Sequence, residues 1–321
     1  MIANTVSIRQ QDNWQNQLRN VITSADQLLA MLQLAPADVC YCPEAIADFA
    51  LKVPLAFVRR MRRGDPRDPL LLQVLARGEE MTQTAGFSTD PLGETGDANP
   101  SRGIIHKYRG RALLIVTGGC AVNCRYCFRR HFPYNDNQNS RTEWDETLEY
   151  IAHDKDISEV ILSGGDPLRA SDAYLDELVT KIAAISHIRR LRIHTRLPVV
   201  IPDRITQGLL DAVRRPGLHT VVVIHSNHAN EMDDSVFAAL DRMRQGGIAL
   251  LNQSVLLAGI NDRADVLIAL SEKLFAAGVI PYYLHLLDKV QGAAHFDVPE
   301  DKAIKLVAEL TKNLSGYLVP K

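Results

Sequence analysis

Cysteine is scarce in this sequence, with five among 321 residues, and this small odd number excludes a disulfide scaffold. Charge of one sign is lacking too: 36 basic and 38 acidic residues leave a net charge of −2, so the overall charge does not favour a nucleic-acid partner. No run approaches the roughly 18 apolar residues that a membrane helix needs, and the polar start MIANTVS is unlike a signal peptide. We therefore expect a cytoplasmic protein with reduced thiols that acts neither on nucleic acid nor in a membrane.

The first third of the chain differs in pattern from the rest. Hydrophobic residues make up 46% and charged residues 23%, as in an ordinary globular protein, and the length suits two domains or one barrel with an appendage. Helical spacing or early prolines predict short helices at 14–22, 25–34, 43–51 and 54–63. A Gly- and Pro-rich stretch at 89–103 is typical of a linker or a long ordered loop. We predict a helical N-terminal region with its linker over 1–105 and a second region over 106–321.

The second region alternates between strand-like and helix-like segments. Apolar runs of strand length lie at 112–117, 159–162, 191–195, 220–225, 248–257 and 279–286. Amphipathic helical segments follow them at 142–152, 171–185, 203–213, 233–245, 263–277 and 299–314. The runs show little polar alternation, which indicates parallel strands buried on both faces. Six such units predict an α/β fold, an incomplete (β/α)6 barrel related to the TIM barrel, with ligands at the C-terminal ends of its strands.

Three cysteines lie within eight residues of the loop after the first predicted barrel strand. Cys120, Cys124 and Cys127 have the spacing C-x3-C-x2-C, and no fourth cysteine is nearby, which suits a metal centre with one open position. A structural zinc site is the alternative, but it needs four protein ligands. Cys40 and Cys42 lie in a separate segment, and we expect them to be ordinary reduced thiols. An iron–sulfur cubane held by three thiolates would leave one iron free to bind a small molecule.

With Tyr126 as its aromatic residue, this triplet resembles the C-x3-C-x-aromatic-C signature of the radical S-adenosylmethionine (SAM) superfamily. The resemblance implies a [4Fe–4S] cluster on the three cysteines, SAM bound to the open iron, and an external electron donor.

The residues that the resemblance assigns to SAM follow later strands. The run Ser163, Gly164, Gly165 and Asp166 takes the place of a Gly-Gly-acidic motif that meets the SAM amino group; a simple tight turn is the alternative. His225 and Gln253 would point from strand ends toward SAM. For His225, a hydrogen-bonded core position is an equal alternative.

The second region also resembles a narrower family, the lysine 2,3-aminomutases. The matching segments are HKY at 106–108, CRYCFRR at 124–130, LSGGD at 162–166, RLPVV at 196–200, HSNHANE at 225–231, NQSVLL at 252–257, PYY at 281–283 and SGY at 315–317. The resemblance implies pyridoxal phosphate (PLP) as a further cofactor and L-lysine as substrate. The chain is most similar to the short bacterial branch that makes (R)-β-lysine from (S)-α-lysine for elongation factor P, to which a separate ligase attaches it.

Four further residues receive roles from this resemblance. Arg129 would pair with the substrate carboxylate, for which a planar guanidinium offers two parallel hydrogen bonds. Asp288 would receive the distal ammonium of lysine; a solvated loop carboxylate is the alternative. Tyr108 and Arg111 would lie near PLP. The lysine that the family uses to hold PLP as a Schiff base lies in a Gly-rich segment, and we expect that segment beyond Lys321, so no catalytic residue is assigned in this chain.

Two other functions stay open at this stage. One is an aminomutase of the same family for another amino acid such as glutamate, although Asp288 would repel a second carboxylate. The other is a non-enzymatic protein that binds a metal or a cluster. The sequence also leaves open whether the chain is a monomer or a homo-oligomer.

Overall fold

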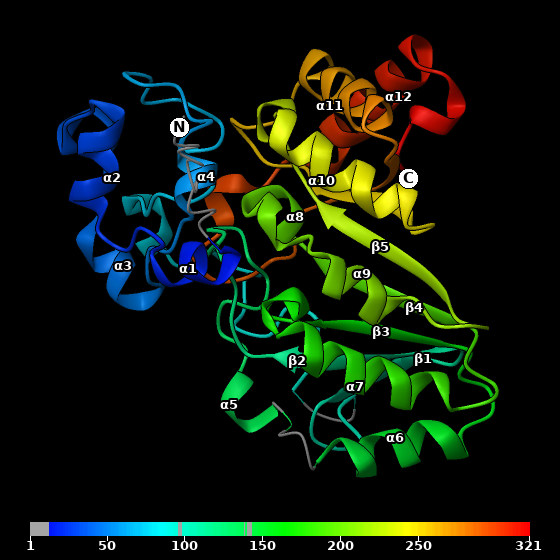
Figure 1. The fold of residues 1–321 in the computed structure, drawn as a ribbon. Helices are drawn as coiled ribbons and strands as arrows, with labels where there is room; N and C mark the ends of the chain where they lie inside the picture. The colour runs from blue at the N-terminus through cyan, green and yellow to red at the C-terminus, as the bar shows by residue number, and fades with distance from the viewer. Residues whose placement is uncertain (1–12, 96–97, 138, 140–142) are drawn as a thin grey trace, which may run out of the picture.

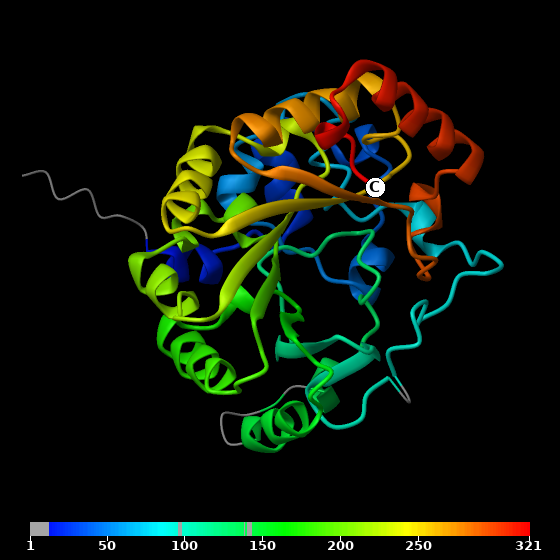
Figure 2. The ribbon, with the colours of Figure 1, turned by 90° about the vertical axis from the view of Figure 1, so that its right-hand side faces the viewer.

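The computed structural model describes residues 13–95, 98–137, 139 and 143–321, and its centre is a seven-stranded sheet with the strands in sequence order (Figure 1). The strands are β1 (Ile104–Tyr108), β2 (Arg111–Thr117), β3 (Glu159–Gly164), β4 (Arg190–Thr195), β5 (His219–His225), β6 (Ala249–Val255) and β7 (Ile280–His285). The first pair is antiparallel and all later pairs are parallel. The six predicted strands are therefore confirmed, and the sheet curves into an open arc (Figure 2).

Six helices cover the convex side of this arc, as the sequence predicted. They are α6 (Trp144–His153), α7 (Asp172–Ala183), α9 (Gln207–Val213), α10 (Asp234–Gln245), α11 (Ala264–Ala276) and α12 (Glu300–Asn313). Side-chain caps help to fix their starts, because the Ser171 hydroxyl accepts from the Tyr174 amide and the Asp233 carboxylate accepts from the Val236 amide. The predicted segment 203–213 begins instead as a 3-10 turn, and Thr142 lies outside the described residues.

The N-terminal region is helical but its helices are shorter than predicted. They are α1 (Trp14–Arg19), α2 (Ala25–Leu32), α3 (Pro43–Asp48) and α4 (Leu55–Val58). The helix predicted to reach residue 63 ends early, since the Asp68 carboxylate accepts from the amides of Arg62, Leu70 and Leu71 and organises a turn there. These helices lie beside the C-terminal ends of the strands (Figure 1). Two short helices, α5 (Tyr134–Asn137) and α8 (Leu197–Val200), lie at the same end.

Strand β1 was not expected from the sequence. It is short, only its first two residues are buried, and it forms a hairpin with β2 at the edge of the sheet, so it lacks a long apolar run. The predicted boundary between residues 105 and 106 falls inside this strand. The division into two regions is not tested by the structure and stays a prediction.

The expectation that the strands are buried on both faces holds for β3, in which every residue is buried, but it is wrong for β4 and β6. Along β4, Leu191 and Ile193 are buried in the main hydrophobic core, whereas Arg192 and His194 alternate with them and stay partly exposed. Strand β6 alternates in the same way. The side chains opposite the core are therefore polar enough to surround a ligand.

The stretch at 89–103 belongs to an ordered crossing of the open side of the arc. Just before it, Ser88 pairs with Val290 beyond β7, and at its far end the Ala98 carbonyl accepts from the His106 amide on β1. The described part of this stretch thus links the two edges of the sheet, as a long ordered loop would.

Candidate active site at the strand ends

The three motif cysteines lie on the loop between β2 and α5, at the C-terminal end of the sheet. All three are partly buried free thiols that interact with one another electrostatically. Burial raises the pKa of Cys120 and the neighbouring Cys127 charge adds to the shift, while burial and Cys124 raise the pKa of Cys127 to about 11. A thiolate trio in this loop therefore needs compensating positive charge, which the irons of a cluster would provide. Among the described residues, no three His, Cys, Asp or Glu side chains converge closely enough for a single metal ion.

The glycine loop after β3 is docked directly on the cysteine loop. The Gly165 amide donates to the Thr117 carbonyl at 2.8 Å, and the Asp166 amide donates to the Gly119 carbonyl at 3.0 Å. Gly164 has φ +110°, and a Cβ on Gly165 would lie 2.4 Å from the Gly119 oxygen. Both glycines are therefore required for these two loops to meet.

The Asp166 carboxylate is fully used inside the protein. Its oxygens accept from the Thr195 hydroxyl at 2.7 Å and from the amides of Leu168, Arg196 and Leu197 at 2.8–3.0 Å. Burial raises its pKa, and these hydrogen bonds oppose the rise. The side chain ties the end of β3 to the end of β4, so the loop backbone, rather than the carboxylate, is free to face a ligand beside the cysteines.

The N-terminal region clamps the cysteine loop from the other side. Arg125, which lies between Cys124 and Cys127 in the sequence, is fully buried. It donates to both oxygens of Glu80 and to the Ala45 carbonyl. Arg130 pairs with the same Glu80 at 3.1 Å and with Asp48 at 3.1 Å. The loop that carries the thiols is thus held by two buried ion pairs to Glu80 and by a half-exposed ion pair to Asp48.

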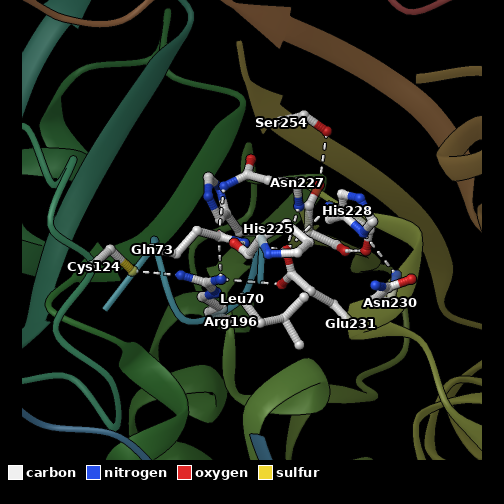
Figure 3. Close-up of polar contacts among 12 residues, drawn as sticks. Leu70, Gln73, Cys124, Arg196, His225, Asn227, His228, Asn230, Glu231 and Ser254 are labelled. Carbon is white, nitrogen blue, oxygen red and sulfur yellow. Dashed lines mark hydrogen bonds and ion pairs between the residues drawn. The ribbon is translucent and has the colours of Figure 1, made fainter. Parts of the chain in front are cut away.

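A buried hydrogen-bond network beside Cys124 was not predicted from the sequence (Figure 3). Arg196, just after β4, donates from Nη1 to the Cys124 Sγ at 2.7 Å and to the Tyr126 hydroxyl at 2.8 Å. Its Nη2 donates to Gln73 at 2.7 Å and to Glu231 at 3.0 Å. The arginine of the RLPVV segment therefore contacts a predicted cluster ligand.

The two residues assigned to SAM on β5 and β6 are neighbours in the sheet. His225 pairs with Gln253 in the strand register, and both are partly buried. His225 stacks on Tyr126 and shares a 2.9 Å hydrogen bond with its hydroxyl. Burial and the Arg196 charge lower the pKa of His225 well below its usual range, so its imidazole is neutral. The structure therefore brings His225 to the aromatic residue of the cysteine motif.

Arg129, assigned to the substrate carboxylate, already holds a carboxylate of the protein. Its Nε and Nη2 donate to the two oxygens of Glu94 at 2.7 and 2.9 Å, and its Nη1 donates to the Ser163 hydroxyl at 3.1 Å and to the Gly164 carbonyl at 3.3 Å. Both partners of this ion pair are almost fully buried. Glu94 was not singled out from the sequence, and it shows that the planar fork of Arg129 can hold a carboxylate at this place.

Asp288 lies beyond β7 and is partly buried in the same electrostatic neighbourhood. Burial raises its pKa, the charge of Glu94 raises it further, and Arg129 and Lys107 oppose the shift. The structure thus brings the residues assigned to the two ends of the substrate within electrostatic range of each other.

Tyr108 ends β1 and Arg111 begins β2, and the two are paired across this hairpin at the opposite end of β2 from the cysteine loop. The Arg111 guanidinium stacks 4.1 Å from the centre of the Tyr108 ring, which is largely exposed. Farther in, burial and the charges of Arg192 and other cations lower the pKa of His194 to about 3, and its Nε2 is buried with no hydrogen-bond partner among the described residues. This cationic interior with an unpaired polar atom fits a phosphate-bearing group such as PLP.

Comparisons with known proteins agree with this geometry. The sequence model of the Radical SAM superfamily matches residues 114–269. L-lysine 2,3-aminomutase of Escherichia coli strain K12 is 51% identical over 99% of this chain and 92% of its own length, and that of Haemophilus influenzae is 49% identical over 98% and 93%. The enzyme of Clostridium subterminale is 33% identical over 96% of this chain and 74% of its own length.

The chain belongs to the L-lysine 2,3-aminomutase family. Both resemblances expected from the sequence are thereby confirmed, and so is the expectation of an isomerase with a partial radical SAM barrel. Membership of the family implies a [4Fe–4S] cluster, SAM and PLP. A solved structure of coproporphyrinogen III oxidase from Escherichia coli is similar over 64% of this chain and 53% of that chain, at 14% identity and a TM-score of 0.39. No helix of the described residues is long and apolar enough to cross a membrane.

Proposed function

We propose that this protein converts (S)-α-lysine to (R)-β-lysine as a SAM- and PLP-dependent 2,3-aminomutase. The observation that carries the proposal is the docking of three motif thiols, a glycine loop and the Arg129 fork at one end of the sheet. Near full-length relatives with this named activity support it. When bound, the cluster with SAM supplies a radical that removes a hydrogen atom from the substrate, and PLP allows the amino group to move between neighbouring carbons.

The chain's own residues would bind and orient these groups. Cys120, Cys124 and Cys127 would hold the cluster, and Ser163, Gly164, Gly165 and Asp166 would shape the SAM site with His225 and Gln253. Arg111 and Tyr108 would lie near the phosphate group of PLP.

Two charged groups would hold the substrate at its ends. Arg129 would bind the α-carboxylate in the fork that Glu94 now fills, which requires Glu94 to give up at least one of its two contacts. Asp288 would accept a hydrogen bond from the distal ammonium. A glutamate substrate would place a second carboxylate against Asp288, which disfavours the alternative substrate.

Reconstitution tests the function directly. The full chain, loaded anaerobically with iron, sulfide and PLP and supplied with SAM and dithionite, should convert L-α-lysine to β-lysine, as followed by chiral chromatography. The same mixture with L-glutamate should give no β-glutamate. Absence of β-lysine from protein with a full cluster would disprove the proposal.

Replacing Asp288 with asparagine is expected to raise the KM for lysine at least tenfold, because a hydrogen bond to a charged group contributes roughly 1.5–3 kcal/mol. Since burial raises the pKa of Asp288, the carboxylate becomes protonated at a higher pH than usual, and the KM of the unaltered protein should rise as the pH falls. The variant should lose this pH-dependent rise.

Asp301→Asn is the matched control for Asp288→Asn, because Asp301 lies on an exposed helix surface, where it pairs with Lys305. Steady-state kinetics across the acidic range measure both variants. An unchanged KM in Asp288→Asn would remove the argument that this residue receives the ammonium.

We further propose that the product serves elongation factor P, through a separate ligase, in the cytoplasm. The resemblance to the short bacterial branch and the reduced state expected of the thiols support this setting. Deleting the gene that encodes the chain should leave elongation factor P without a β-lysyl group in mass spectra. Sedimentation would show whether the protein works as a homo-oligomer.

A further inference from the structure

Arg196 is a buried cation, and both terminal nitrogens of its side chain are hydrogen-bonded. Nη1 contacts Cys124 and Tyr126, and Nη2 contacts Gln73 and Glu231. Its backbone amide is bound by Asp166 at 2.8 Å. A guanidinium with four occupied Nη hydrogens cannot rotate away from the thiol without breaking several bonds at once.

The partners of Arg196 are themselves fixed. The second oxygen of Glu231 accepts from the amides of Asn227 and His228 at 2.9 and 3.1 Å and from Gln73 Nε2 at 3.2 Å. The Gln73 Oε1 also accepts from Asn227 Nδ2 at 3.0 Å. Figure 3 shows these residues converging from the N-terminal region and from the ends of β4 and β5.

Arg196 and Glu231 form an oriented ion pair. The positive end contacts the Cys124 sulfur, and the negative end lies on the far side of the guanidinium, with both side chains almost fully buried. A buried arrangement of charges acts strongly on a neighbouring charge because little water screens it. When a cluster takes up one electron, its negative charge grows by one, so a positive group at its ligand favours the reduced state.

We propose that Arg196 is a positioning residue of the cluster: it donates an N–H···S hydrogen bond to the Cys124 thiolate and, balanced by Glu231, sets the reduction potential of the cluster. The proposal rests on the proposed function only in requiring a cluster on the three cysteines. It assigns Glu231 the opposite influence, since its carboxylate partly cancels the guanidinium charge.

The test is a potentiometric titration of the reconstituted cluster with dithionite and mediators, read by electron paramagnetic resonance without lysine. Arg196→Gln leaves Glu231 unbalanced and should lower the ratio of reduced to oxidised cluster at least tenfold at a fixed potential, which is about 59 mV for one electron. Glu231→Gln leaves Arg196 unopposed and should shift the midpoint in the opposite direction. Because no substrate is present, failure of the aminomutase reaction does not affect this result.

Arg192→Gln is the matched control. Arg192 also pairs bidentately with a carboxylate, that of Glu159, but it lies four residues earlier on β4, about 13 Å away along the strand. Its removal should leave the midpoint nearly unchanged. Equal midpoints in the unaltered protein, Arg196→Gln and Glu231→Gln, or shifts of the same sign in both variants, would overturn the proposal.

Loss of the cluster in either variant does not end the test. In the unaltered protein with 15N-labelled arginine guanidinium groups, pulsed resonance of the reduced cluster should detect a coupled arginine nitrogen, which Arg196→Lys should weaken. No such coupling in the unaltered protein would show that Arg196 does not contact the cluster ligand.

Discussion

Replacing Gly165 with alanine is expected to abolish cluster binding, and with it all β-lysine formation. An alanine Cβ would lie 2.4–2.7 Å from three backbone atoms of Gly119, distances that no rotation of a side chain can relieve. One of the two loops must move, and overpacking of this kind costs roughly 1–3 kcal/mol or more. Because Cys120 directly follows Gly119, the displacement falls on a predicted ligand.

Iron and sulfide analysis after anaerobic reconstitution measures the effect, with less than a tenth of the normal content expected. Gly316→Ala is the control, because nothing lies within 4 Å of its Cβ position and its backbone φ is ordinary. That variant should load a full cluster. A Gly165→Ala protein with full iron content and normal activity would show that the two loops do not need this close approach.

Replacing Arg129 with lysine is expected to lower kcat/KM for lysine at least 100-fold. A lysine ammonium cannot form the two parallel hydrogen bonds of a guanidinium, and losing one partner of a buried hydrogen-bonded charge pair costs about 2–5 kcal/mol. The substitution weakens two interactions, that with the substrate carboxylate and that with the buried Glu94, which is also left poorly paired. Steady-state kinetics of the reconstituted variant give the measurement.

Two companion variants separate substrate binding from general destabilisation. Arg263→Lys changes an exposed arginine that also pairs bidentately, with Asp265, and should leave kcat/KM unchanged. Glu94→Gln keeps an acceptor for Arg129 but makes it neutral and easier to displace, so the KM for lysine should fall. A kcat/KM within threefold of normal in Arg129→Lys would exclude Arg129 from binding the substrate carboxylate.

Much of the barrel could be predicted from the sequence because its signals are local. Each apolar run of strand length, and each capped amphipathic segment such as that after Ser171, is a short stretch that can be recognised without the rest of the chain. Strand β1 was not predicted, because its stability comes from pairing with β2 at a sheet edge rather than from its own burial. The polar concave side was not predicted from the sequence. Apolar residues such as Val221 and Leu251 also lie on it, and they weaken the alternation of polar and apolar residues along the strands.

That the three cysteines lie together at the strand ends could be predicted, because they belong to one short motif after a predicted strand. The network around Arg196 could not be predicted, since Gln73 lies 123 positions away from it in the chain. An isolated arginine after a strand has no local signal that distinguishes it from a solvated one. Glu94 was missed for a similar reason: it lies in a Gly- and Pro-rich stretch where acidic residues are common.

The clamp on the cysteine loop limits how such a protein can be rebuilt. Arg125 and Arg130 lie on the barrel side, yet Glu80, the acceptor that they share, comes from the N-terminal region. A chimera that joined this barrel to a foreign N-terminal segment would leave two buried guanidinium groups without a counter-charge, at a cost of roughly 3–5 kcal/mol for each broken pair. Engineering by recombination therefore has to exchange residues 43–81 and the cysteine loop as one unit.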